Sequence, residues 1–211
     1  MIKRLLSLAF ASALAVAGAA AADAPQAPDV ALKNTTDQIR SMIKDHYSEY
    51  RADPNKFYKA VDEVVVPRFD LPYIAKLVLG ANYRTATPDQ RTRFASAFKD
   101  MLVHAYATAM LDNYNSAKIT WDAPRMEANG GDGSIGSHLV KDSGQNFDIV
   151  FRVHQVNNDW LVYDLVVDNV SLVFNFRTQL NSEIRKGGLD DVIARMVKGE
   201  FIHDSNQPQP K

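Results

Sequence analysis

The chain has 211 residues, with 24 Lys and Arg against 25 Asp and Glu, and no cysteine. This length allows one substantial hydrophobic core or two small ones. A composition of 46% apolar and 23% charged residues excludes disorder over the whole chain. The net charge of −1 gives no general attraction to nucleic acid. The missing cysteines exclude disulfides, thiolate catalysis and cysteine-ligated metal sites.

The first residues have the features of a secretory signal peptide. Lys3 and Arg4 give a positive start, residues 5–16 form an apolar stretch too short to span a bilayer, and small alanines precede Asp23. Export without cysteine is typical of a periplasmic protein, whose stability need not depend on disulfides. The predicted organisation is a cleavable signal peptide at 1–22, a single domain at 23–200 and a flexible polar tail at 201–211.

The first half of the mature chain has the apolar spacing of helices. Residues 35–38 (Thr-Thr-Asp-Gln) form a capping-box pattern, so a helix is predicted to begin there after a Pro- and Ala-rich lead-in. Residues 87–90 form a second capping box with Pro88 at the first helical position, and they open the longest predicted helix. Two further helices are predicted to begin at Asp53-Pro54 and Asp70 and to end at Pro67 and Gly80.

The pattern then changes to the alternation of strands. Ser171 marks the start of a later helix, Gly187-Gly188 its end, and residues 189–197 a last short helix. Helices, then hairpin-linked strands, then helices predict an α+β fold with an antiparallel sheet. The predicted strands are residues 118–127, 134–141, 147–153 and 160–167, with Asn157-Asn158 as the tight turn of the last hairpin.

Sequence motifs for common chemistries are weak. Gly131-x-Gly133-x-x-Gly136 matches a dinucleotide-binding string, but no apolar strand precedes it and a strand follows it, so it is interpreted as a hairpin turn. The five histidines lie far apart in the sequence and predict no metal site. The basic residues form no stripe interleaved with aromatic residues, which argues against nucleic-acid binding.

The remaining feature of the sequence is the large number of apolar residues in the predicted strands and helices. A strand that is apolar on both faces must be covered on both faces. Composition does not distinguish a filled core from a hollow one, so an ordinary core and a ligand cavity both remain open. The final predicted strand carries Leu161, Tyr163, Leu165 and Val167 on one face and Trp160, Val162 and Val166 on the other.

Two stretches of sequence contain motifs specific enough to indicate a protein family. Together they resemble the MlaC family, the periplasmic phospholipid-binding shuttles of the outer-membrane lipid-asymmetry pathway, also described as toluene-tolerance auxiliary proteins of an ABC transporter. The resemblance covers residues 35–197, although the family more often has Glu-Gly where this chain has Asp168-Asn169. The first stretch is FDLPYIAKLVLG at 69–80, followed by Tyr83-Arg84 and the 87–94 segment. The second is WLVYDL at 160–165, DNVSL at 168–172, and Phe176-Arg177-x-Gln179.

The resemblance implies a four-stranded antiparallel sheet, related to the NTF2-like group and wrapped by helices. It implies a deep apolar pocket for phospholipid tails between sheet and helices, with phospholipid as cargo and with no cofactor and no catalysis. It also implies two partners, an outer-membrane lipoprotein–porin complex and an inner-membrane ABC transporter with a lipid-handling periplasmic domain. The protein would carry phospholipid between them and maintain outer-membrane lipid asymmetry.

On this basis we expect the acyl tails to lie between the longest predicted helix and the sheet. Which face of the strands points toward the tails is not assigned. Arg84 and Arg177 are the candidates for contact with the head-group phosphate, but a surface salt bridge is the preferred interpretation of each. The predicted tail pocket is Val78, Leu79, Phe94, Phe98, Met101, Leu102, Tyr106, Phe147, Ile149, Phe151, Trp160, Val162, Tyr163, Leu165, Val170, Leu172 and Val173.

Two other classes of function stay open. NTF2-like sheets also host enzymes that use a buried Asp–His pair in a pocket, and here the pair is His154 and Asp164 on neighbouring predicted strands. The third class is an interaction module with a solid core. Phospholipid that co-purifies with the protein distinguishes the carrier from both.

Overall fold

The structure is a computed structural model, and it describes residues 26–128 and 130–201. The predicted signal peptide at 1–22 and the predicted tail from residue 202 onward lie outside the described residues. The elements in chain order are α1 (Pro28–Ala52), α2 (Pro54–Val64), the 3-10 helix η1 (Val66–Arg68), α3 (Leu71–Leu79), α4 (Asn82–Thr85), α5 (Pro88–Asn113), β1 (Ala117–Trp121), β2 (Arg125–Met126), β3 (Asp132–Lys141), β4 (Asn146–Val156), β5 (Asp159–Val167), β6 (Val170–Ser171), α6 (Leu172–Gly187) and α7 (Leu189–Val197).

Short polar side chains begin the helices where the sequence predicts. Asp70 Oδ1 accepts a hydrogen bond from the Tyr73 backbone N–H at 3.0 Å, which caps α3. Thr87 and Gln90 form the full capping box at the start of α5, each side chain accepting from the other residue's backbone N–H. These groups satisfy helix N–H donors that have no partner within the helix.

The first helix begins earlier than the sequence predicts. It starts at Pro28, whose fixed φ suits a first helical position, and it runs through residues 35–38 without interruption. The Thr35 and Thr36 hydroxyls donate to carbonyl oxygens one turn back, at 3.0 and 2.9 Å, instead of capping. The capping-box prediction at 35–38 is therefore wrong, because a helix start already lies upstream.

The strands form one antiparallel sheet. Within the described ranges it has six strands in the order β1-β3-β4-β5-β6, with β2 pairing to β3. The predicted number of four is corrected in two places: the single strand predicted at 118–127 is divided into β1 and β2, and β6 has only two residues, too few for an alternation pattern to show in the sequence. Gly133 and Gly136 lie inside β3, so only the first glycine of the Gly-rich string belongs to the turn.

A bulge between β4 and β5 explains the two-faced apolar pattern. Arg152 pairs with Asp164, but the next pair along the ladder is Val153 with Val162, so Tyr163 is skipped. The side-chain alternation of β5 shifts by one residue there. One face of β5 therefore carries Trp160, Val162, Leu165 and Val167, all opposite the same face of β4.

Two tight turns fix the ends of β5. Asn157 and Asn158 have φ of 49° and 71°, the left-handed pair that a two-residue hairpin requires, so the predicted turn is confirmed. Asp168 and Asn169, with φ of 48° and 65°, form the same kind of turn between β5 and β6.

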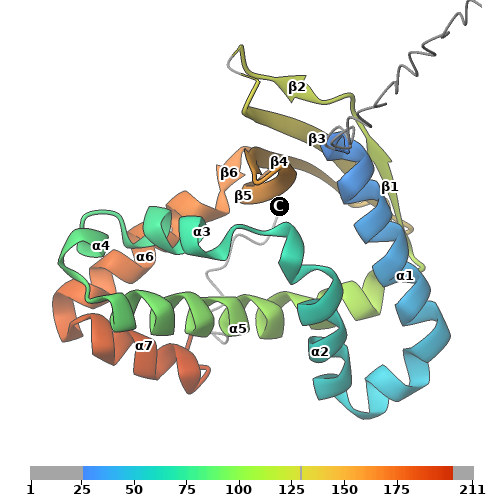
Figure 1. Cartoon of the computed structure of the whole chain (residues 1–211). Helices are drawn as coiled ribbons and strands as arrows, with labels where there is room; N and C mark the ends of the chain where they lie inside the picture. Colours follow the sequence, from blue (N-terminus) through green and yellow to red (C-terminus); the bar gives the residue numbers. More distant parts are fainter. Residues whose placement is uncertain (1–25, 129, 202–211) are drawn as a thin grey trace, which may run out of the picture.

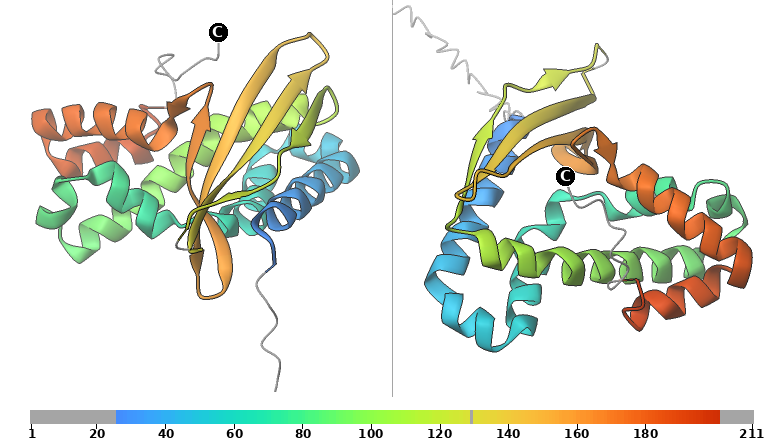
Figure 2. Two further views of the ribbon diagram at one scale, coloured as in Figure 1. Left: turned by 90° about the horizontal axis from the view of Figure 1, so that it is seen from above. Right: turned by 180° about the vertical axis from the view of Figure 1, so that it is seen from behind.

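The helices form two cores on either side of the long helix α5. The α3–α7 core joins α3, α6 and α7 to the first half of α5 around Phe94 and Phe98. The α1–α2 core joins α1 and α2 to the second half of α5 around Ile43, Phe57 and Leu111. Figure 1 shows α5 extending from the α6–α7 side to α1 beneath the curved sheet, and Figure 2 shows the same arrangement from two further sides. Within the described residues, no helix is long and apolar enough to cross a membrane.

The strand register brings His138 between two carboxylates on the sheet surface. Its Nδ1 lies 2.7 Å from Asp148 Oδ1 and its Nε2 lies 3.4 Å from Asp122 Oδ1. The hydrogen bond to Asp148, aided by the charge of Asp122, raises the pKa of His138 above 6.5. A pKa raised by folding stabilises the protein below about pH 6.5, and this contribution is lost as pH rises through the raised pKa.

We therefore expect an NMR titration to give His138 a pKa above 6.5, and the Asp148→Asn variant to bring it back toward that value. An unchanged titration in the variant would contradict the β3–β4 register.

Candidate functional site: an apolar cavity beneath the sheet

An apolar cavity of about 460 Å³ lies between the sheet, α1 and the second half of α5. The sheet wall is formed by the inward face that the β-bulge selects. The strand residues that line it are Ala117, Ile119, Trp121, Leu139, Lys141, Phe147, Ile149, Phe151, Leu165 and Val167.

The opposite wall comes from two helices at helical spacing. α5 contributes Tyr106, Ala109, Met110 and Asn113, which share one face because they are three, four and seven residues apart. Val65, Arg68 and Phe69, from the connection between α2 and α3, complete the lining together with Tyr114. The α1 residues are Leu32, Thr35, Thr36, Ile39, Arg40 and Ile43.

Some of the side chains that face the cavity are not fully covered by protein atoms. Ala109 is exposed, and Ile149, Phe151 and Leu165 are only half-buried, although they lie on the inward face of the fold. In the α3–α7 core, by contrast, Phe94 is 0% exposed. Each square ångström of apolar surface left in water costs roughly 25 cal/mol, so an unfilled apolar cavity favours an apolar ligand.

The charged groups that line the cavity are all cationic. They are Arg40, Arg68 and Lys141, and no carboxylate from the part of the chain that the structure describes lines it. Arg68 lies 4.0 Å from Asp159, and Lys141 Nζ lies 5.2 Å from the centre of the Phe147 ring. Burial raises the pKa of the Tyr106 hydroxyl, so this group is neutral at physiological pH. Within the described residues, no group of three or more His, Asp or Glu side chains is arranged to hold a metal ion.

The structure divides the predicted tail-pocket residues between this cavity and the packed cores. The predicted residues that line the cavity are Tyr106, Phe147, Ile149, Phe151 and Leu165. Those that lie in or against the α3–α7 core instead are Val78, Leu79, Phe94, Phe98, Met101, Leu102, Tyr163, Leu172 and Val173.

The physical reason is the length of α5. Its first half is covered by α3, α6 and α7, and only its second half faces the sheet, so the prediction placed the first half at the cavity incorrectly. Trp160 and Val162 face inward but are packed among Leu32, Ile135 and Val153. Val170 lies in β6 opposite Val167, which lines the cavity, but Val170 itself is 41% exposed and is not among the lining residues.

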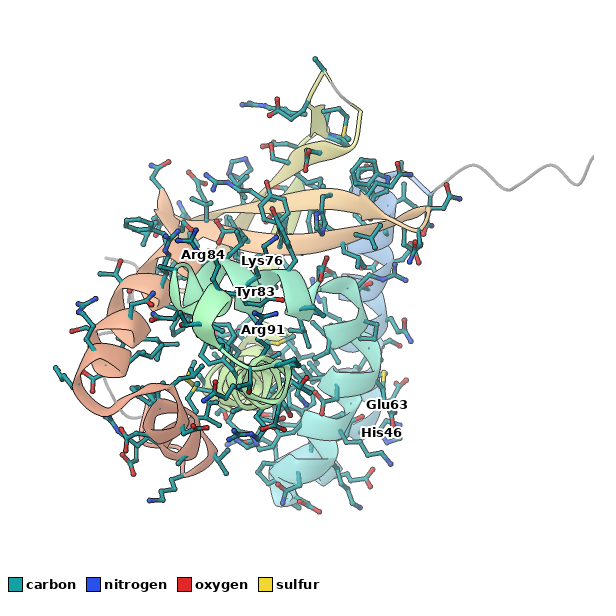
Figure 3. The ribbon with its side chains drawn as sticks, turned by 60° about the vertical axis from the view of Figure 1, so that its left-hand side comes forward. His46, Glu63, Lys76, Tyr83, Arg84 and Arg91 are labelled. Atoms are coloured by element: carbon teal, nitrogen blue, oxygen red, sulfur yellow. The ribbon has the colours of Figure 1, made fainter. Side chains whose placement is uncertain are left out.

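The predicted head-group residues lie elsewhere. Arg84 is on α4, next to Tyr83 in the chain, and both are labelled in Figure 3. The Arg177 guanidinium packs on Gly80, where a Cβ would approach Nε to 2.8 Å. Neither arginine lines the cavity, and within the part of the chain described neither forms an ion pair, so the salt-bridge alternative is not formed either.

The predicted catalytic pair is also not formed. His154 Nε2 lies 2.9 Å from Asp70 Oδ2, and Asp164 accepts hydrogen bonds from Arg152 Nη1 at 3.2 Å and Ser171 Oγ at 2.7 Å. The register places Asp164 opposite Arg152, and His154 opposite Leu161. The hypothesis of a His154–Asp164 acid–base pair is therefore wrong.

The comparison with known proteins agrees with the sequence resemblance. Residues 33–198 match the family described as MlaC protein. The chain belongs to the MlaC family. It is 29% identical over 168 residues to the toluene tolerance protein ttg2D of Pseudomonas putida, covering 79% of this chain and 77% of that protein. It is 26% identical over 176 residues to the intermembrane phospholipid transport system binding protein MlaC of Haemophilus influenzae, covering 82% of each.

A solved structure shares the fold of this MlaC-family chain. The phospholipid-binding protein from Ralstonia solanacearum, solved in complex with a phospholipid, has a TM-score of 0.73 at 24% identity. The match covers 86% of this chain and 99% of that one. The predicted family and the mixed fold of helices and antiparallel sheet are thus confirmed.

Sequence reasoning missed the contribution of α1 to the cavity in this MlaC-family chain. Leu32, Ile39 and Ile43 lie at helical spacing, and a helix traced from Pro28 would have placed them on one face. The incorrect capping box at 35–38 hid this pattern, because it left Leu32 outside the helix. The β1 residues and Leu139 of β3 had no signal of their own, since pairing alone decides which strand face is inward.

Proposed function

We propose that this chain is a periplasmic carrier that holds the acyl tails of a phospholipid in the cavity between α1, the second half of α5 and the sheet. The observation that carries the proposal is an apolar cavity that the protein's own side chains leave unfilled. The names of the ttg2D and MlaC relatives and the phospholipid in the Ralstonia protein support it.

The energetics explain why a cavity is needed. Each methylene group transferred out of water contributes about 0.8 kcal/mol, so the two tails of an ordinary phospholipid represent on the order of 20 kcal/mol. A lipid therefore does not cross an aqueous compartment without apolar cover. The carrier must not bind much better than a bilayer does, because release at the receiving membrane would then stall.

The proposal includes a route. We propose export by the signal peptide at 1–22, loading and release at an outer-membrane lipoprotein–porin complex and an inner-membrane ABC transporter, and maintenance of outer-membrane lipid asymmetry. The cavity acts by sequestering tails, and the mechanism proposed here needs no catalytic step. Val78, Phe94 and the other predicted residues in the packed cores would then support the cavity walls rather than contact the tails.

The test is direct. We expect an organic extract of the purified full-length protein to contain phospholipid at about one molecule per chain, measured by mass spectrometry against an internal standard. A periplasmic protein without an apolar cavity, purified in parallel, controls for lipid carried over from membranes. An empty protein that also fails to take up lipid from phosphatidylglycerol vesicles would contradict the proposal.

A further inference from the structure

A second hollow of about 380 Å³ adjoins the apolar cavity on the α1 side. It is lined by Arg40, Ser41, Lys44, Tyr114 and Asn115. Arg40 and Tyr114 line both spaces, so they stand where the apolar cavity meets the second hollow. The lining changes there from apolar side chains to cations, hydroxyls and an amide.

The fold brings these groups together from two distant segments. Arg40 and Lys44 are four residues apart on α1 and share a face, with Ser41 beside them. Tyr114 follows the last residue of α5, and its ring lies 5.2 Å from that of Tyr47 on α1, which holds the end of α5 against α1. Figures 1 and 2 show the same meeting of α1 with the end of α5.

The cations that line this hollow have no carboxylate partners among the described residues. Within the described residues, Arg40 and Lys44 form no ion pair, whereas other cations of α1, such as Lys33 and Arg51, pair with carboxylates. Among residues 26–128 and 130–201, no Asp or Glu lines either space. Lys141, which lines the apolar cavity, adds a third cation without a carboxylate partner among the described residues. The residues that line the hollow therefore include two cations that are not neutralised by an ion pair within the described residues.

We propose that this second hollow binds the phosphate of the lipid head group while the tails occupy the apolar cavity. This inference rests on the proposed function. Arg40 presents a planar fork that matches two phosphate oxygens, and Lys44 adds a point charge. The Ser41 and Tyr114 hydroxyls and the Asn115 amide are further donors to phosphate oxygens. The ligand class is a diacyl lipid with a phosphodiester head group, in preference to an uncharged diacyl lipid.

The experiment compares two lipids with the same tails. Delipidated full-length protein is incubated with vesicles that contain equal amounts of dioleoylphosphatidylglycerol and dioleoylglycerol, and mass spectrometry gives the ratio of the two bound lipids. The Arg40→Gln/Lys44→Gln variant is expected to lower that ratio at least about tenfold, because hydrogen bonds to charged groups are lost while the tail contacts remain. The matched control is Lys76→Gln/Arg185→Gln, which makes the same charge change at exposed positions outside both spaces; it is expected to keep the wild-type ratio.

Each outcome decides one point. A ratio unchanged in the Arg40/Lys44 variant, or lowered equally in the control, overturns the head-group site and leaves the carrier function intact. A wild-type protein that takes up neither lipid overturns the carrier function and the head-group site together. Inorganic phosphate at about tenfold molar excess over lipid is expected to leave lipid loading unchanged, since phosphate has no tails to bury. Complete loss of lipid loading in the presence of phosphate would assign the hollow to free phosphate instead.

Discussion

An Ala109→Trp variant is expected to lose at least about tenfold in phospholipid loading while it keeps its fold. Ala109 lines the cavity from α5 and is not covered by other side chains, so an indole at this position is expected to occupy space that the tails need. Displacing about two methylene groups already costs roughly 1.6 kcal/mol, which is more than a tenfold change in affinity. The measurement is the amount of lipid per chain after incubation with phosphatidylglycerol vesicles, determined by mass spectrometry.

The control for this variant is the preceding residue. Thr108 is exposed on the same helix but does not line the cavity, so Thr108→Trp adds the same side chain on another face of α5. It is expected to load lipid as the wild type does. Equal loading by both variants, with circular dichroism showing intact folds, would place the tails outside this cavity.

An Asp164→Ala variant is expected to lose about 3 kcal/mol of unfolding free energy, because a buried carboxylate with several hydrogen bonds is removed. Asp164 is 4% exposed and joins β5 to the start of α6. It accepts hydrogen bonds from Ser171 Oγ at 2.7 Å and from the Val173 backbone N–H at 3.1 Å. Its loss leaves the Val173 N–H without this acceptor and weakens the position of Ser171, which caps α6.

Urea denaturation at neutral pH measures this loss. The matched control is Asp159→Ala on the same strand, where the carboxylate is exposed and lies 4.0 Å from Arg68. Exposed ion pairs contribute about 0–1 kcal/mol, so a change of this small size is expected. Equal destabilisation by the two variants would show that the contacts of Asp164 do not anchor α6.

Local chemistry made much of the fold predictable. The caps at Asp70, Thr87 and Ser171 and the turn at Asn157-Asn158 are short-range devices, and each is visible within a few residues of sequence. The predicted start of α1 was wrong because the sequence contains two patterns that are each typical of a helix start. Pro28 and the 35–38 capping box both fit a helix start, and burial of Leu32 against the sheet agrees with the earlier one.

The residues of the candidate site were harder to predict from the sequence than the fold was. Phe94 and Tyr106 lie on the same helix, yet only Tyr106 reaches the cavity, because α3, α6 and α7 cover the first half of α5. The β-bulge at Tyr163 moves Val162 and Leu165 to one face, which an even alternation would separate. Both effects depend on contacts between segments that are far apart in the chain.

Motifs and neighbouring residues were enough to predict the family, the order of helices and strands, and the positions of most helix caps and turns, because each of these depends on short stretches of the chain. The tertiary structure alone decided which apolar residues fill a core and which surround a void, because packing of distant elements sets that difference. It also decided that Arg40 and Lys44, separated from Tyr114 by the length of α2 to α5, stand together at the edge of the cavity.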